Sequence, residues 1–156
     1  MTVMEVIDFD PRFARAFLAL NEAWVSRHFV MEAKDYEVLG DPQGAIIDKG
    51  GFVFFAVEAG AAVGCCALIP MNDGGFEIAK MAVDEAFKGR GIGRALMTAC
   101  VDCARLQAAP RLYLESGSIL TPAVSLYRAF GFQDLPAERR PVSPYARADV
   151  WMELIL

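Results

Sequence analysis

The chain has 156 residues, of which 55% are hydrophobic and 22% charged, and its formal net charge is -5. This length suits one domain that buries about two-thirds of the surface its unfolded chain exposes, without disulfide or metal support. The acidic balance argues against nucleic acid and anionic membranes as partners, because both would need an extended basic surface. Any function that needs positive charge must therefore be local.

The four cysteines do not form the spaced framework of a secreted domain. Cys65 and Cys66 are adjacent, while Cys100 and Cys103 lie within a helical pattern, where core packing is favoured over a redox role. The N-terminus carries no apolar export segment, so we expect a reducing, cytoplasmic location. His28 is the only histidine, which argues against a multi-histidine metal site, and we expect no metal.

The predicted elements begin with a strand over 2–7 and a helix of about four turns. The Asp10-Pro11 pair provides an N-cap and a proline at the first helical position. Apolar residues then recur at helical spacing: Phe13, Phe17, Leu20 and Trp24. A short second helix in "MEAKDYEVLGDPQG" is expected to end near Gly40, and "DKGG" at 48–51 is expected to form a turn.

Residues 52–71 hold one charge and are long enough to span a bilayer. Glu58, Gly60 and Pro70 favour a hairpin instead, with strands over 52–58 and 62–69 about a small-residue turn. Apolar residues occupy both alternating faces of the first strand. We therefore expect helices to cover both faces of the sheet.

The second half continues the alternation of strands and helices. A strand is predicted over 76–83, an amphipathic helix from Gly91 to about Ala108, and a strand in "RLYLES". Thr121-Pro122 repeats the cap-and-proline start of a helix that Gly131 ends, and "GFQDL" and "ADVWMELIL" offer two more strands. The order βααβββαβαββ predicts one compact α/β domain over 1–156.

The stretch "KGRGIGR", residues 88–94, joins a predicted strand to a predicted helix. A helix start leaves amides unpaired and carries partial positive charge, so it favours an anion. Glycines at 89, 91 and 93 would let a phosphate reach those amides, and Lys88, Arg90 and Arg94 add charge. A solvated glycine turn is the alternative. Arg94 occupies the third glycine position of a dinucleotide-binding GxGxxG, and no GxxxxGK(S/T) occurs.

Two segments resemble the GNAT superfamily of N-acetyltransferases. "KGRGIG" is similar to its acyl-CoA signature, Gln/Arg-x-x-Gly-x-Gly/Ala, with Lys88, Gly91 and Gly93 in frame and lysine in place of the usual Gln or Arg. "ESGSILTPAVSLYRAFGF" resembles its closing segment, in which a helix carries Ala-x-x-x-Tyr and ends in Gly-Phe. The resemblance implies a mixed, mostly antiparallel sheet of six to seven strands with helices on both faces.

It also implies acetyl-CoA as the acyl donor. Backbone amides of Arg90 to Arg94 would hold the pyrophosphate, and the edge of strand 76–83 would pair with the pantetheine arm like an added strand. The implied binding residues are Met81, Ala82, Val83, Lys88, Gly89, Arg90, Gly91, Ile92, Gly93, Arg94 and Tyr127. Many relatives carry an asparagine where this chain has Leu120, so that contact is absent or replaced, with Ser116 and Ser118 as unassigned alternatives.

The same resemblance implies three catalytic groups. The Met81 amide would bind the developing oxyanion, Glu77 would be the general base, and Tyr127 the general acid for the departing thiolate. In a regular strand 77, 79, 81 and 83 share one face, so Glu77 could reach the site, with Lys80 on the other face. A solvated or salt-bridged Glu77 and a half-buried, packed Tyr127 are the alternatives.

The resulting hypothesis is an N-acetyltransferase that moves an acetyl group directly to the primary amine of a small molecule, amino acid-like compound or peptide. The acceptor groove is expected between the first two helices, near Trp24, His28 and Phe29, and the loop at 137–147. Within that loop Arg139 and Arg140, with Tyr145 and Arg147, either recognise a substrate carboxylate or are solvated. A non-catalytic acyl-CoA-binding or sensing module is the alternative function. No nucleic acid or membrane partner is expected, and the apolar tail "WMELIL" offers a homodimer interface.

Overall fold

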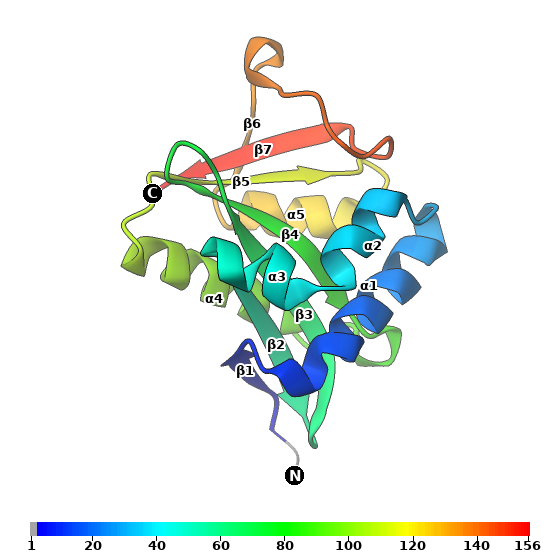
Figure 1. Cartoon of the computed structure of the whole chain (residues 1–156). Helices are drawn as coiled ribbons and strands as arrows, with labels where there is room; N and C mark the ends of the chain where they lie inside the picture. Colours follow the sequence, from blue (N-terminus) through cyan, green and yellow to red (C-terminus); the bar gives the residue numbers. More distant parts are fainter. Residues whose placement is uncertain (1–2) are drawn as a thin grey trace.

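The computed structural model describes residues 3–156, which form one seven-stranded sheet in the order β1-β2-β3-β4-β5-β7-β6 (Figure 1). Neighbouring strands are antiparallel except for β4 and β5, which are parallel. The strands are β1 (Glu5–Asp8), β2 (Phe52–Glu58), β3 (Ala61–Pro70), β4 (Phe76–Val83), β5 (Arg111–Ser116), β6 (Gln133–Asp134) and β7 (Val150–Ile155). The predicted mixed, mostly antiparallel sheet is confirmed. Residue 2 of the first predicted strand lies outside the described residues.

Helices cover both faces of the sheet, as predicted (Figure 1). One face carries α1 (Ala14–His28), α2 (Ala33–Leu39) and α3 (Pro42–Ala45), and the other carries α4 (Ile92–Leu106) and α5 (Thr121–Ala129). Short 3-10 helices occupy Pro11–Phe13, Ile47–Lys49, Glu85–Phe87 and Ala137–Arg139.

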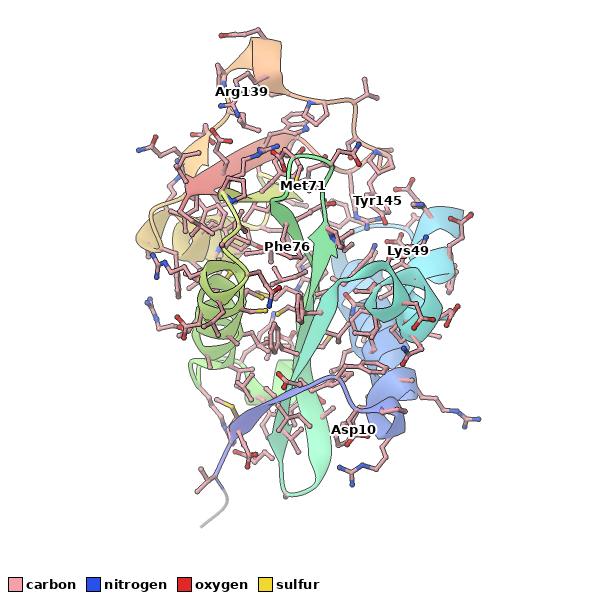
Figure 2. The ribbon with its side chains drawn as sticks, turned by 60° about the vertical axis from the view of Figure 1, so that its left-hand side comes forward. Asp10, Lys49, Met71, Phe76, Arg139 and Tyr145 are labelled. Atoms are coloured by element: carbon pink, nitrogen blue, oxygen red, sulfur yellow. The ribbon has the colours of Figure 1, made fainter. Side chains whose placement is uncertain are left out.

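The hydrophobic core is divided by the sheet into two layers (Figure 2). Phe54 of β2 packs in the layer under α4, and its neighbour Phe55 packs under α1, where the Phe17 ring meets it edge-on at 6.3 Å. Alternating side chains of one strand thus enter opposite layers. This explains why residues of both parities in 52–58 are apolar, and it confirms the hairpin over the membrane alternative.

Two helix starts differ from expectation. Thr121 is the first residue of α5 rather than its cap, and the residue before it, Leu120, makes no side-chain capping bond. After Gly40 the chain begins a separate short helix, α3, whose cap Asp41 accepts a hydrogen bond from the Gly44 amide at 3.0 Å. Asp41-Pro42 repeats the pattern of Asp10-Pro11, so the same rule could have located α3 from the sequence.

The C-terminal tail forms an interior strand. β7 lies between β5 and β6, with Met152 fully buried and Trp151 and Leu154 partly buried. The apolar composition of "WMELIL" is therefore accounted for by packing within this chain, although Ile155 remains exposed. The tail gives no separate reason to expect a dimer.

Strand β4 contains a bulge that the sequence analysis did not foresee. Cys65 pairs with Ala82 and Ala67 with Ala79, so Lys80 and Met81 together lie opposite the single residue Cys66. The extra residue reverses the alternation of side chains along the strand. Ile78 and Met81 both pack in the α4 layer, so Glu77 and Met81 do not share a face, and that expectation is wrong.

Strands β4 and β5 separate soon after they meet. Their pairing comprises Phe76 with Leu112 and Glu77 with Tyr113. Beyond Glu77 the edge of β4 that faces β5 is therefore open to another partner for hydrogen bonding. The open edge, the bulge and the N-terminus of α4 lie close together in the fold.

Candidate active site

The glycine turn before α4 has the backbone that only glycine adopts readily. Gly89 has a φ of 79° and Gly91, the N-cap of α4, a φ of 77°. A Cβ atom at either position would meet nothing within 4 Å, so the requirement is for conformation rather than space. The turn brings the first amides of α4 to the surface, where the helix dipole adds positive character.

The cations of this stretch are held at its margins. Lys88 pairs with Glu85 at 2.9 Å, Arg90 pairs with Glu58 at 3.1 Å, and the Arg94 guanidinium lies over the Phe130 ring at 5.6 Å. These contacts are largely exposed and weak in water. The turn therefore offers backbone amides directly and positive charge from exposed side chains around it.

A groove of about 420 Å³, the glycine-turn groove, runs from this turn to α5. It brings together most of the predicted binding residues, although the side chains of Arg90 and Arg94 are not part of its lining. The lining comprises Trp24, His28, Met81, Ala82, Val83, Phe87, Lys88, Gly89, Gly91, Ile92, Gly93, Ile119, Leu120, Pro122, Ala123, Leu126 and Tyr127. Its lining joins the glycine turn at the start of α4 to apolar side chains of α5, which suits a ligand with an anionic end and an apolar part.

A second cavity, the polar cavity, has a volume of about 100 Å³ and adjoins the groove. Its lining includes Glu77, Glu115, Lys80, Tyr145 and Arg147. The two spaces share four lining residues, which are Trp24, Met81, Leu120 and Tyr127. A group that enters from the groove and a group bound in the polar cavity would therefore meet beside Met81 and Tyr127.

Glu77 lies in the polar cavity and not in the groove. Burial raises the pKa of its carboxyl to about 7, and repulsion from Glu115 acts in the same direction, against a smaller opposing effect of Lys80. Within residues 3–156 no group forms a hydrogen bond with this carboxylate. A carboxyl with such a pKa can both accept and release a proton near neutral pH.

Tyr127 of α5 lies at the junction of the two spaces. Its half-buried ring packs against Phe132, with ring centroids 6.2 Å apart. Burial raises the pKa of its hydroxyl to about 12. The hydroxyl therefore carries its proton at neutral pH and can serve as a proton or hydrogen-bond donor.

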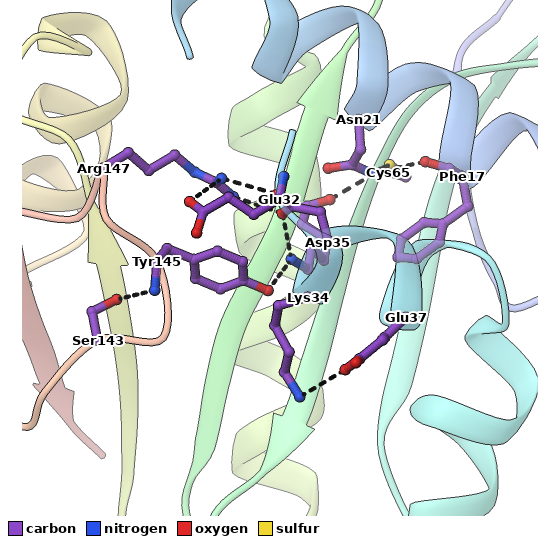
Figure 3. A network of polar contacts seen from close by, with 11 residues as sticks. Phe17, Asn21, Glu32, Lys34, Asp35, Glu37, Cys65, Ser143, Tyr145 and Arg147 are labelled. Atoms are coloured by element: carbon purple, nitrogen blue, oxygen red, sulfur yellow. Dashed lines mark hydrogen bonds and ion pairs between the residues drawn. The ribbon is translucent and has the colours of Figure 1, made fainter. Parts of the chain in front are cut away.

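The most extensive polar network of the cavity involves residues that the sequence analysis did not assign (Figure 3). Lys80 Nζ donates to Tyr145 Oη at 2.6 Å and to Asp35 Oδ1 at 3.2 Å. Arg147 donates to both oxygens of Asp35, at 2.7 and 3.0 Å. Burial opposes ionisation of Asp35, but the hydrogen bonds from Arg147 and the Glu32 amide and the Lys80 charge lower its pKa to about 2.

Lys80 was expected on the opposite face from Glu77, yet both side chains line the polar cavity. The bulge is the reason. Residue 80 is the extra residue of the strand, so its side chain does not follow the alternation that would place it on the face opposite Glu77. Arg147 is not a solvated loop residue, since it is paired with Asp35 and with Glu32 at 3.4 Å. No local sequence pattern links positions so far apart.

Comparison with known proteins shows which family has this arrangement. The profile of the acetyltransferase (GNAT) family matches residues 12–132. The chain belongs to the GNAT acetyltransferase family. It is 36% identical over 91 residues to an IAA acetyltransferase of Azospirillum brasilense, a match covering 58% of this chain and 57% of that protein. The chain spans about half the length of the curated relatives it matches.

Solved structures share the whole fold at low sequence identity. A GNAT acetyltransferase from Staphylococcus aureus has a TM-score of 0.88 and 16% identity, covering 97% of this chain and 98% of that one. An acetyltransferase from Salmonella typhimurium, solved with its cofactor acetyl-CoA, has a TM-score of 0.75 and 19% identity, covering 98% and 94%. At these identities the likeness shows the fold alone.

Most of the other candidate contact residues of this GNAT chain line the groove, the polar cavity or both. Leu120, where the family resemblance implied an asparagine contact, lies at the junction of groove and cavity. Ser116 lines the polar cavity, whereas Ser118 donates to Asp149 through its hydroxyl at 2.7 Å and is not in either lining. His28 lines the groove rather than the polar cavity, while Trp24 lines both.

The cysteines of the GNAT domain are packing residues, as expected for Cys100. Cys100 is fully buried, and its Sγ atom lies 3.1 Å from Cys66 Sγ of β3 rather than near Cys103. Among the described residues no group of three or more histidine, cysteine or acidic side chains could hold a metal ion. Over the same range no helix combines the length and apolar character that a bilayer crossing requires.

Proposed function

We propose that this protein is an N-acetyltransferase that transfers an acetyl group from acetyl-CoA directly to a primary amine held in the same complex. The observation that carries the proposal is the meeting of the glycine-turn groove and the polar cavity at Met81 and Tyr127. Two separate binding spaces with one shared boundary are what direct transfer between two bound substrates needs. The family and the acetyl-CoA-bound relative support this choice of donor.

The donor fits the glycine-turn groove. Amides of Arg90 to Arg94 at the start of α4 would bind the pyrophosphate, since Gly89 and Gly91 carry no side chain that would cover them. The open edge of β4 at Met81 to Val83 would pair with the pantetheine arm. When bound, acetyl-CoA supplies an activated acetyl group as a thioester at the junction with the polar cavity.

The acceptor amine would occupy the polar cavity. An aliphatic amine arrives as an ammonium ion and must lose a proton before its nitrogen attacks. Glu77, with a pKa of about 7, would take that proton directly or through a water molecule. The new bond joins nitrogen to the acetyl carbon, the bond from that carbon to sulfur breaks, and the second proton that the nitrogen loses as it becomes an amide passes to solvent.

Two further groups would assist the transfer. The Met81 amide would donate a hydrogen bond to the carbonyl oxygen, where negative charge develops. The Tyr127 hydroxyl, protonated at neutral pH, would give its proton to the departing sulfur and regain one from solvent. Removal of one oxyanion donor typically costs about 10²–10³ in kcat.

The experiment is thiol release from acetyl-CoA measured across a panel of amines, with the wild type and Tyr127→Phe. We expect turnover that depends on the amine, and a loss of about 10²-fold or more in kcat for the variant. Tyr36→Phe is the matched control, because Tyr36 lies on the exposed side of α2 and bonds only Glu22. Turnover without any acceptor dependence, together with full activity of Tyr127→Phe, would refute the proposal. Binding of acetyl-CoA without turnover of any amine would support the sensing module instead.

A further inference from the structure

We propose that Lys80 is a positioning residue that locks the bulge of β4 and so holds the Met81 amide at the junction of the two binding spaces. The inference rests on the proposed function only in the role given to Met81. The bulge itself is an observed feature, in which Lys80 and Met81 lie opposite Cys66 alone.

Lys80 holds a backbone conformation that L-residues avoid. Its φ is 57°, in the left-handed region, within an otherwise extended strand. This region is disfavoured by about tenfold or more for a residue with a Cβ atom. Such a residue persists only where its surroundings hold it, so contacts of Lys80 must stabilise the bulge.

The side chain of Lys80 provides those contacts. It is 7% exposed, and its Nζ bonds Asp35 of α2 and Tyr145 of the loop before β7. Asp35 is held in turn by Arg147, and both Lys80 Nζ and the Arg147 guanidinium lie 4.4 Å from the centre of the Tyr145 ring. Two segments that are distant in the sequence, α2 with Asp35 and the loop with Tyr145 and Arg147 (Figure 3), thus converge on this one side chain.

The position of Met81 depends on this bulge. With the extra residue, Met81 packs in the α4 layer and lines the groove, as does Val83. Without it, the alternation of the strand would continue from Ile78 and place Met81 on the α1 side. A bulge that relaxed even part of the time would move the amide away from the thioester carbonyl, with little effect on the glycine turn that binds the pyrophosphate.

The decisive comparison is Lys80→Gly with Lys80→Ala. Both remove the ammonium group, but glycine accepts a positive φ and alanine does not. We expect Lys80→Ala to lower kcat by about tenfold or more, with KM for acetyl-CoA within about twofold of wild type, and Lys80→Gly to recover most of that loss. Ala59→Gly is the matched control, because Ala59 has a φ of 51° in the β2–β3 turn and lies outside both linings, and its kcat should not change.

Amide hydrogen exchange, measured by NMR on the free protein, tests the lock without any assay of activity. The Ala82 amide, at the position of β4 that pairs with Cys65 of β3, should exchange faster in Lys80→Ala than in the wild type, by about tenfold, and at an intermediate rate in Lys80→Gly. If Lys80→Ala does not fold, Tyr145→Phe removes one anchor and should raise exchange of the same amide selectively.

The proposal is overturned if Lys80→Ala keeps wild-type kcat and wild-type exchange at Ala82. It is equally overturned if Lys80→Gly is no better than Lys80→Ala, because the ammonium group itself would then act in the reaction. Failure of the proposed function is distinguishable: no amine would be acetylated by the wild type, while the exchange rate at Ala82 would still report whether Lys80 locks the bulge.

Discussion

Replacing Glu77 by glutamine should remove activity and yet stabilise the protein at neutral and alkaline pH. The variant keeps the size and polarity of the side chain but cannot accept a proton. In the wild type the Glu77 carboxyl must ionise in a largely buried cavity near Glu115. Glu77 therefore lowers the free energy of unfolding at every pH at which this carboxyl is ionised in the unfolded chain.

The magnitude follows from the pKa, which is displaced upward from 4.5 to about 7. Between these values the folded protein retains a proton that the unfolded chain has lost, so the free energy of unfolding falls as the pH rises through this window. The full displacement corresponds to about 3 kcal/mol, and partial solvation of the cavity reduces this to about 1–3 kcal/mol. Below pH 4.5 the wild type and Glu77→Gln should be equally stable, and at pH 8 the variant should be more stable by that amount.

Urea unfolding from pH 4 to pH 8 measures the stability, and thiol release measures the rate. The wild-type kcat/KM should rise with pH through about 7, as Glu77 loses its proton, and Glu77→Gln should show neither that rise nor significant turnover. Glu37→Gln, at an exposed position of α2, is the control. Equal stability of Glu77→Gln and wild type at pH 8 would show that folding does not raise the pKa of this carboxyl. Wild-type turnover by the variant would show that the carboxyl is not the general base.

Two more predictions concern donor binding and the polar network. Gly91→Val places a β-branched residue at a φ of 77°, so it should weaken acetyl-CoA binding at least tenfold in titration calorimetry. Ala86→Val, which lies outside both linings, should not weaken it. Unchanged affinity of Gly91→Val for acetyl-CoA would refute the role of the turn. Arg147→Met leaves the buried Asp35 with Lys80 and the Glu32 amide and should cost about 2–4 kcal/mol of unfolding free energy. The exposed pair of Arg12 with Asp10 provides the contrast, since Arg12→Met should cost far less in the same urea titration.

The glycine turn shows how much local sequence can determine. Positions 89 and 91 have positive φ, which glycine adopts at a lower cost than any L-residue. Ile92 to Leu106 then form a helix whose apolar stripe faces the sheet. The hairpin and the coverage of both faces likewise follow from short-range periodicity. These features depend on neighbours within a few residues, so the sequence alone was enough to predict them.

The bulge and the polar network were decided only by the tertiary structure. Strict alternation assigned Glu77 and Met81 to one face, but residue 80 is accommodated as an extra residue because Asp35 and Tyr145, distant in the sequence, bind its side chain. The elevated pKa of Glu77 has the same origin, since it depends on burial and on the proximity of Glu115 from a neighbouring strand. Local pattern therefore specified which elements form and where an anion fits, whereas long-range contacts determined which side chains share the polar cavity.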